Sequence, residues 1–246
     1  MIELTIITAH YNNIEGLIKT YKSISSQTYK KWKLYIVDSF TPKIKNLIGK
    51  EILNDPRVKL YKVKSSIYDA MNFGILMARS KYIQILNSGT TYHSRFSLEK
   101  SMNIIEKLHI KNGVMLHFFN MQVMAKDKIL YINKPSRFSH PLRCGHEAAI
   151  YPNRLKGKIL HYHKYKIAAD LGFIIDNADR YKTVYHDFIF VNYPKGGYSD
   201  SKDKFFEKLL SHLIILKELL IRNKISASIL LMTRILKDLI RNYFFK

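Results

Sequence analysis

The first ninety residues alternate short apolar runs with amphipathic ones. The apolar runs have the length of buried strands, and the amphipathic runs between them have helical spacing. The predicted strands are Leu4–Thr8, Leu34–Asp38, Val58–Val63 and Tyr82–Leu86. The predicted helices between them are Ile14–Ser26, Ile44–Leu53 and Ile67–Ala78. Strands that alternate with crossover helices predict an α/β fold with a mostly parallel sheet.

The pattern changes after residue 90. Arg95–His109 predicts another helix, and Val114–Phe119 and Ile129–Ile132 predict two strands joined by a turn. Residues 164–178 are helix-like, and residues 183–193 are strand-like. We expect these elements to complete the same domain, residues 1–200.

The remaining residues, 201–246, predict a basic extension of two helices joined near Asn223 and Lys224. In the second helix, apolar residues recur four and three positions apart along one face. They are Ile225, Ile229, Met232, Leu236, Leu239 and Tyr243. This pattern favours two interpretations that can coexist. The helices form a hairpin that packs on the domain and could pair two copies, or they form an amphipathic anchor on a membrane surface.

The chain of 246 residues carries 41 Lys or Arg and 19 Asp or Glu, which gives a formal charge of +22. Such a charge favours polyanionic partners, among them nucleotide diphosphates, anionic lipids and nucleic acid. A single cysteine, Cys144, excludes a disulfide within the chain and fits a reducing compartment. No apolar run approaches the ~20 residues that span a bilayer, and the N-terminus has no leader pattern. The sequence therefore predicts a cytoplasmic protein.

Polar residues directly follow each predicted strand of the N-terminal half. They lie in the segments Thr8–Asn12, Asp38–Thr41, Ser65–Asp69 and Asn87–Thr90. In open α/β sheets, ligands bind outside the carboxyl ends of the strands. We therefore expect these four segments to converge on one rim and to form a binding site.

Residues 65–89, SSIYDAMNFGILMARSKYIQILNSG, resemble the donor-binding centre of the inverting glycosyltransferases of family 2. The resemblance is to short bacterial members that build capsule, O-antigen and lipooligosaccharide. Four further segments occur in the order of that family: TIITAHYNNIEGL, LYIVDSF, GHEAAIY with AADLGF, and GGYSD. The resemblance covers roughly residues 2–200 and implies a GT-A fold and a nucleotide-sugar donor.

The resemblance also implies which residues meet the donor, most simply a UDP-sugar. Asp38 would accept a hydrogen bond from the uracil ring, and Tyr11 would stack on it. The full expected set is Thr8, His10, Tyr11, Asn12, Asp38, Ser66, Asp69, Asn72, Asn87, Ser88, Gly89 and Thr90.

Two acidic positions of the family are absent. Thr90 stands where the family has the Asp that holds a divalent metal ion, and Lys64, Ser65 and Ser66 replace an Asp-Xaa-Gly. We therefore expect no metal ligands here, although Mg²⁺ or Mn²⁺ remains an alternative. Protein cations would then stabilise the diphosphate. The candidates are Lys64, His93, Arg95, Arg143 and His146.

The acceptor side resembles the His-Gln-Ala and Ala-Asp-Tyr-Asp segments of the family, with Glu147 in place of Gln. An inverting displacement needs one carboxylate that takes the proton of the acceptor hydroxyl. The resemblance assigns that role to Asp170, and Glu147 is the competing base. His146 would contact either the diphosphate or the acceptor.

The sequence thus predicts an inverting transfer of a sugar to a hydroxyl of a bacterial surface glycan or its lipid-linked precursor, at the inner leaflet. Two other classes stay open. An inactive GT-A fold that serves as a binding or scaffold protein would explain the missing acids. A nucleic-acid-binding protein would explain the charge, but the chain has no base-reading motif. We therefore expect no nucleic-acid partner.

Overall fold

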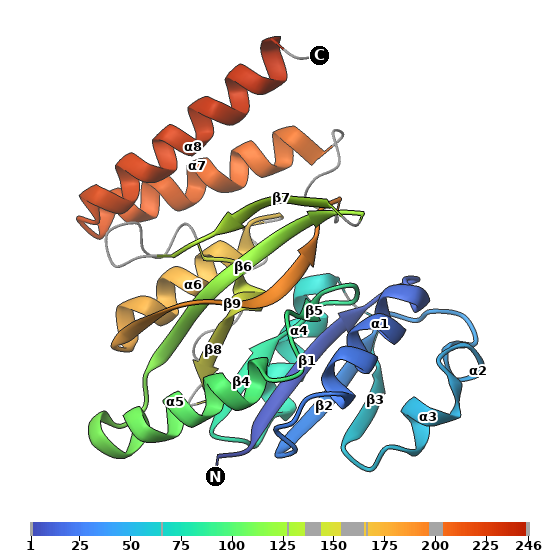
Figure 1. The fold of residues 1–246 in the computed structure, drawn as a ribbon. Helices are drawn as coiled ribbons and strands as arrows, with labels where there is room; N and C mark the ends of the chain where they lie inside the picture. Colours follow the sequence, from blue (N-terminus) through green and yellow to red (C-terminus); the bar gives the residue numbers. More distant parts are fainter. Residues whose placement is uncertain are drawn as a thin grey trace.

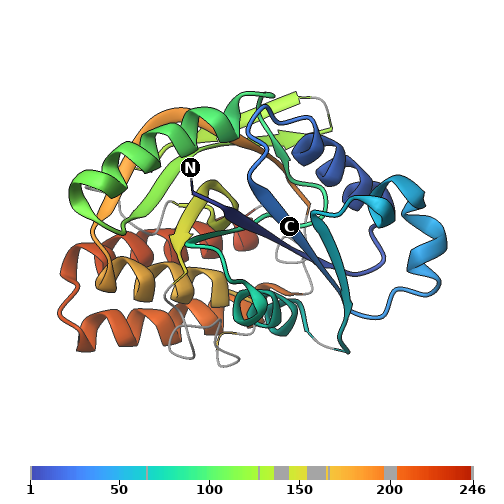
Figure 2. The same cartoon turned by 90° about the horizontal axis from the view of Figure 1, so that it is seen from below.

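The computed structural model describes residues 2–64, 66–126, 128–135, 144–153, 165, 167–196 and 204–244. One curled sheet runs through the molecule, with helices on both of its faces (Figures 1 and 2). The strands are β1 Leu4–His10, β2 Trp32–Asp38, β3 Val58–Lys62, β4 Tyr82–Ile85, β5 Thr91–Tyr92, β6 Leu116–Ala125, β7 Lys128–Asn133, β8 Ala149–Pro152 and β9 Thr183–Pro194. The helices are α1 Ile14–Ser25, α2 Ile44–Leu47, α3 Gly49–Asn54, α4 Ile67–Met77, α5 Ser97–Asn112, η1 His146–Ala148, α6 Ala169–Arg180, α7 Phe205–Ile221 and α8 Ile225–Phe244.

The strand order is β3-β2-β1-β4-β8-β6-β9-β5, with β7 paired to β6. The first four strands of this order pair in parallel, as the alternation of strands and helices predicts. The second half is mixed: β8 runs antiparallel to both β4 and β6, whereas β6 and β9 are parallel. The predicted α/β fold is confirmed, and its parallel character belongs to the N-terminal half.

Alternate residues of β1 face opposite sides of the sheet, which is the period of a strand buried on both faces. Leu4 and Ile6 lie in an apolar cluster that includes α1, α3 and α5. Ile7 and Ala9 lie in a second cluster that includes α4, α6, α7 and α8. The molecule therefore has three layers, and the sheet is the central one (Figure 2).

Helix α4 lies unusually close to the sheet because residue 74 is glycine. A Cβ atom added at Gly74 would lie 2.4 Å from Cγ2 of Ile7, a contact that real Cβ atoms do not make. A larger residue would push α4 away from β1, at a cost of roughly 1–3 kcal/mol for an overpacked core. This contact fixes the height of the whole α4 segment above the strands.

One predicted helix is divided in the structure, one strand was not predicted, and one apolar stripe faces away from the domain. The helix predicted for Ile44–Leu53 is split into α2 and α3, because Gly49 adopts a φ of +79°. Strand β5 is only two residues long, so no alternation could reveal it. The apolar stripe predicted on the last helix does not face the domain: Leu236 is 58% exposed, and α8 packs through Ala227, Leu231 and Ile235.

A pair of stacked histidines lies between β6 and β9. His117 Nδ1 lies 3.0 Å from His186 Nε2, and His117 is fully buried. Burial and the neighbouring imidazoles of His186 and His109 lower the pKa of His117 to about 3. Burial lowers the pKa of His186 to about 4. Both rings are therefore neutral in the folded protein at neutral pH.

The low pKa values of these two histidines lower the free energy of unfolding in acid. An unfolded imidazole titrates near pH ~6.5, so below that pH the unfolded chain takes up protons that the folded chain does not. We expect the full stability above about pH 6.5, and a loss of up to ~1.4 kcal/mol per pH unit for each ring as the pH falls toward 4. Urea unfolding at several pH values measures this slope. His117→Phe should flatten it, and His93→Phe, at an exposed histidine, should not; equal slopes in both variants would contradict the assignment.

Candidate active site

The polar segments that follow β1, β2 and β4 meet at one rim of the sheet. His10 and Asp38 are opposite each other at the ends of β1 and β2. His10 Nδ1 lies 2.9 Å from Ser88 Oγ, and the Asn12 amide donates to Thr41 Oγ1 at 3.0 Å. The turn after β4 is thus tied to the ends of the two neighbouring strands, as the topology predicts.

Several predicted donor residues are buried beneath this rim. Thr8 is fully buried, and its hydroxyl donates to the Leu86 carbonyl at 2.7 Å. Asp38 is also fully buried, and the Thr41 amide donates to its two oxygens at 3.2 and 3.0 Å. His10 is buried as well, and burial lowers its pKa although Asp38 partly offsets this. In this structure these three side chains hold the rim backbone in place.

Other predicted donor residues face solvent. Tyr11 is 63% exposed, and Asn12 adopts a left-handed φ of 49° just before α1 begins. Ser66 is the N-cap of α4: its hydroxyl accepts from the Asp69 amide, and the Asp69 carboxylate accepts from the Ser66 amide and hydroxyl. Asn72 is half-buried, three residues beyond Asp69 on the same helix. Asp69 therefore has a capping role, and a shared contact of Asp69 and Asn72 with the donor stays a prediction.

Hydrogen bonds from Thr20 of α1 hold the turn Asn87–Thr90 against that helix. The Thr20 hydroxyl donates to the Thr90 carbonyl at 2.9 Å and accepts from the Gly89 amide at 2.9 Å. Gly89 has a φ of +107°, which suits glycine. Thr90 itself is only 1% exposed, so its side chain lies inside the fold rather than on the rim.

A polar cluster connects this turn to the acceptor-side segments, and we call it the acid–imidazole cluster: Asn87, His146, Glu147 and Asp170. Asn87 Nδ2 lies 3.1 Å from His146 Nε2 and donates to Glu147 Oε1 at 3.3 Å. His146 Nδ1 lies 3.3 Å from Asp170 Oδ2, and its Nε2 lies 3.4 Å from Glu147 Oε1. The imidazole ring is therefore placed between two carboxylates.

The two carboxylates favour the charged form of the His146 imidazole, although the Asn87 Nδ2 donor lies beside its Nε2 atom. Burial alone lowers the pKa of His146, but Glu147 and Asp170 outweigh it and raise the pKa to about 9. Burial raises the pKa of Glu147, and the neighbouring His146 charge opposes that rise. The Glu147 side chain is 6% exposed, whereas that of Asp170 is 36% exposed. Asp170 is therefore the more accessible of the two carboxylates, and its role as the base stays a prediction.

Two residues to which the sequence assigned no role hold the segment before Asp170. The Tyr68 hydroxyl of α4 donates to the Ile167 carbonyl, and the Ile167 amide donates to Ser211 Oγ of α7 at 3.5 Å. Tyr68 belongs to the YDAMN segment, where its role was hidden among predicted donor contacts. Ser211 carried no signal, because its partner lies 44 residues away in the chain. Asp170 lies in the first turn of α6, where the helix dipole favours a carboxylate.

The cations predicted to stabilise the diphosphate lie in different parts of the structure. His146 lies in the acid–imidazole cluster, and Lys64 is exposed just after β3. The Arg95 carbonyl accepts from the Thr28 amide, beyond the far end of α1, a 12-residue helix about 18 Å long. The Arg95 backbone therefore lies away from the donor rim, and a contact of its side chain with the diphosphate stays a prediction. His93 bonds to Asn192 of β9, and Arg143 lies outside the described residues.

Among its described residues, the rim has no acidic ligand set that would hold a divalent ion. Within the residues that the structure describes, no three His, Cys, Asp or Glu side chains form a group that could bind a metal ion. Asp38 and Asp69 are engaged by Thr41 and Ser66, and Thr90 supplies a buried hydroxyl. Mg²⁺ prefers carboxylate oxygens, so these residues fit it poorly.

Among solved structures, the fold is similar to TarS of S. aureus. One TarS structure matches with a TM-score of 0.65 and 16% identity, over 87% of this chain and 40% of that one. TarS 1–349 with UDP-GlcNAc matches with a TM-score of 0.66 and 16% identity, over 87% of this chain and 66% of that one. The same fragment with UDP matches with a TM-score of 0.63 and 14% identity, over 87% of this chain and 65% of that one. At these identities the likeness concerns the fold, and the chain spans less than half of the longer TarS chain.

No curated protein matches the chain. The model of glycosyl transferase family 2, however, matches residues 5–142, which is more than half of the sequence. The matched region contains β1 to β7 and the whole rim formed by β1, β2 and β4. The chain belongs to glycosyl transferase family 2.

Proposed function

We propose that the protein transfers a sugar from a UDP-sugar to a hydroxyl group, with inversion at the anomeric carbon. Family membership supports sugar transfer, and the UDP and UDP-GlcNAc complexes of TarS support this class of donor. The observation that carries the proposal is the acid–imidazole cluster, in which the half-buried Asp170 is joined through His146 to Asn87 of the donor-side turn. Residues 1–200 would form the catalytic part.

In the proposed reaction, the oxygen of the acceptor hydroxyl attacks the anomeric carbon on the face opposite the diphosphate. Asp170 takes the hydroxyl proton as the new carbon–oxygen bond forms. The bond between the anomeric carbon and the diphosphate breaks, and the nucleoside diphosphate leaves with the electron pair. The exposed rim residues Tyr11, Asn12 and Ser66, with the N-terminus of α4, would bind the donor.

His146 would act through Asp170 rather than on the leaving group. Its Nδ1 lies against the Asp170 carboxylate, and it is almost fully buried, so its charge favours the ionised form of the base and fixes its direction. Glu147, which is deeper still, would keep the imidazole protonated. The acceptor is a hydroxyl of a surface glycan or its lipid-linked precursor, as the resemblance to polysaccharide-building members implies.

A nucleotide screen tests this function. UDP and UDP-sugars should raise the melting temperature by several degrees, whereas GDP and CMP should not. Release of UDP from a UDP-sugar in the presence of acceptor glycan should then be measured. A chain that neither binds nor turns over any nucleotide sugar would be an inactive fold with a binding or scaffold role.

We also expect activity to survive removal of divalent metal ions. Neither Thr90 nor the engaged Asp38 and Asp69 provide the free carboxylates that a diphosphate-bridging ion needs. UDP release in excess EDTA should equal that in Mn²⁺. Turnover that collapses on chelation and returns with manganese would refute the expectation.

A further inference from the structure

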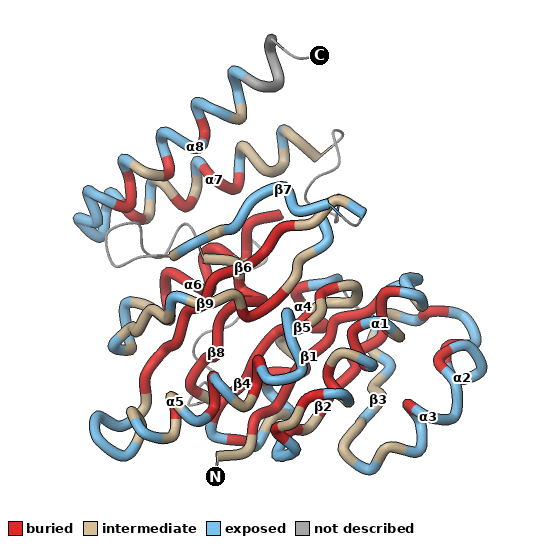
Figure 3. Tube along the Cα trace, viewed as in Figure 1, coloured by how far each residue is buried: buried red, intermediate tan, exposed pale blue. Residues whose placement is uncertain are grey.

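The outer face of α8 carries a row of exposed apolar side chains. Six of them are between 39% and 67% exposed: Ile225, Ile229, Met232, Leu236, Leu239 and Ile240. They recur four and three residues apart, so they share one face of the helix. We call this row the outer stripe. Its exposure is visible along α8, at the edge of the molecule (Figure 3).

The outer stripe is separate from the face through which α8 packs. Ala227, Leu231 and Ile235 are at most 8% exposed and lie in the apolar cluster shared with α4 and α6. Helix α8 is thus apolar on two adjacent faces, and the domain covers only one. A surface helix needs one apolar face to bind its own domain, so the outer stripe serves another contact.

Helix α7 repeats this arrangement beside α8. Its exposed apolar residues are Phe206, Leu210, Leu213, Leu220 and Ile221, between 46% and 76% exposed. Its buried residues include Ile215 and Leu219 on the opposite side. Both C-terminal helices therefore present apolar side chains outward.

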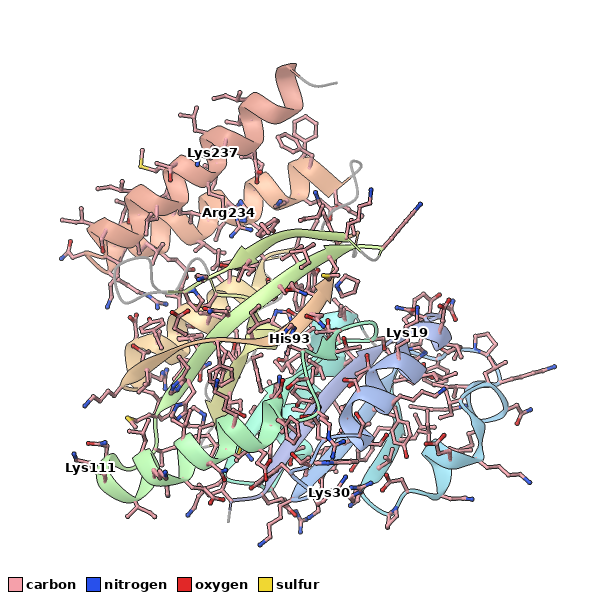
Figure 4. The ribbon with its side chains drawn as sticks, viewed as in Figure 1. Lys19, Lys30, His93, Lys111, Arg234 and Lys237 are labelled. Carbon is pink, nitrogen blue, oxygen red and sulfur yellow. The ribbon has the colours of Figure 1, made fainter. Side chains whose placement is uncertain are left out.

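Cations accompany these apolar residues. Lys237 of α8, labelled in Figure 4, and Lys217 of α7 are exposed. Arg234 is also exposed, but it lies on the side of α8 opposite the outer stripe. From residue 202 to residue 246 the sequence has ten Lys or Arg against four Asp or Glu. Two copies that paired through these helices would bring like charges together, whereas an anionic surface would neutralise them.

Among the described residues, no helix is long and apolar enough to cross a bilayer. A helix with an apolar stripe beside cations instead lies in the plane of the membrane surface, with its apolar side chains among the acyl chains. We propose that the outer stripe of α8 docks the protein on an anionic lipid surface, with Lys237, which borders the stripe, against the headgroups.

The docking helices also touch the candidate active site. Ser211 of α7 accepts from the Ile167 amide, three residues before Asp170, and Leu219 of α7 packs in the same cluster as Phe173 of α6. A protein held on lipid by α8 therefore keeps Asp170 within two packed helices of the membrane surface. This location suits an acceptor that is linked to lipid, but the docking itself does not depend on catalysis.

Cosedimentation with vesicles tests the docking. The full chain should bind vesicles of phosphatidylglycerol and phosphatidylcholine in equal parts, and it should bind pure phosphatidylcholine far more weakly. Leu236→Glu should weaken binding to the anionic vesicles by about 10-fold or more, since it removes one inserted side chain and adds a like charge. High salt should weaken binding by the wild type.

Ile110→Glu is the matched control, because Ile110 is an 87% exposed apolar residue beside Lys111 on α5, away from α7 and α8 (Figure 4). It should bind as the wild type does, and both variants should melt at the wild-type temperature. Equal binding by Leu236→Glu and Ile110→Glu would overturn the proposal. The proposal would also be overturned if the wild-type protein did not bind vesicles but self-associated through Leu236, as measured by sedimentation at increasing protein concentration. UDP binding that is unchanged in Leu236→Glu separates this result from any failure of the proposed catalysis.

Discussion

Asp170→Asn is expected to lower the rate of sugar transfer by about 10²- to 10⁴-fold, the contribution typical of a positioned general base. The amide keeps the size of the side chain and its place beside His146 Nδ1, but it cannot take the proton of the acceptor hydroxyl. Binding of UDP should be unchanged, because Asp170 belongs to the predicted acceptor-side segment rather than to the predicted donor set. The measurements are the steady-state rate of UDP release with acceptor, and UDP affinity by calorimetry.

Glu147→Gln is the matched control for that variant. It makes the same chemical change one position beyond His146, at a side chain that is only 6% exposed. If Asp170 is the base, Glu147→Gln retains most of the rate of transfer. If Glu147 is the base, Glu147→Gln loses the rate and Asp170→Asn retains most of it. Equal and full activity in both variants would place the base outside the acid–imidazole cluster.

His146→Gln is expected to move the acid limb of the pH–rate profile to higher pH, by about one unit or more. The positive charge of His146 lies 3.3 Å from Asp170 and favours the ionised form of that carboxylate. Removing the charge should therefore raise the pKa of Asp170. We also expect the rate at neutral pH to fall roughly 10- to 100-fold, because the base is no longer held in direction. The rate is measured across the pH range with saturating UDP-sugar.

Loss of stability must be separated from this effect. Removing His146 leaves Glu147 as a buried carboxylate without its cation, which typically costs about 3–5 kcal/mol. The double variant His146→Gln/Glu147→Gln removes that charge and should recover much of the stability while the pH profile stays shifted. A profile identical to that of the wild type would show that His146 has only a packing role. His93→Gln, at an exposed histidine, is the control for the substitution itself.

The sequence predicted the N-terminal half well because its strands are buried on both faces and its helices follow a regular alternation. The limits of β1, β2 and α4 match the expected ones within two residues. The helix that the structure divides at Gly49 could not be foreseen, since glycine is compatible with a continuous helix and only the observed φ of +79° shows the break. The faces of α8 were ambiguous for a different reason: both are apolar, so periodicity alone did not say which one packs.

The sequence predicted which segments meet at the candidate site, but not which of their side chains are buried. The motifs indicated correctly that segments after β1, β2 and β4 meet, because strand order determines that. They did not reveal that Thr8, Asp38 and Thr90 are buried, because the burial of Thr90 depends on its packing under α1. Nor could any local pattern reveal the bond between Tyr68 and Ile167, which are 99 residues apart.

That bond, together with the contacts of Asn87, also limits how the enzyme can change. Tyr68 and Asn87 belong to donor-side segments, yet each holds a part of the acceptor side in place. A mutation that reshapes the donor turn in order to admit a different sugar will therefore also displace the proposed base. New donor preferences would arise more readily at Tyr11, which is exposed at the rim. Selection for a new sugar should accordingly act on the rim first and leave the shared residues unchanged.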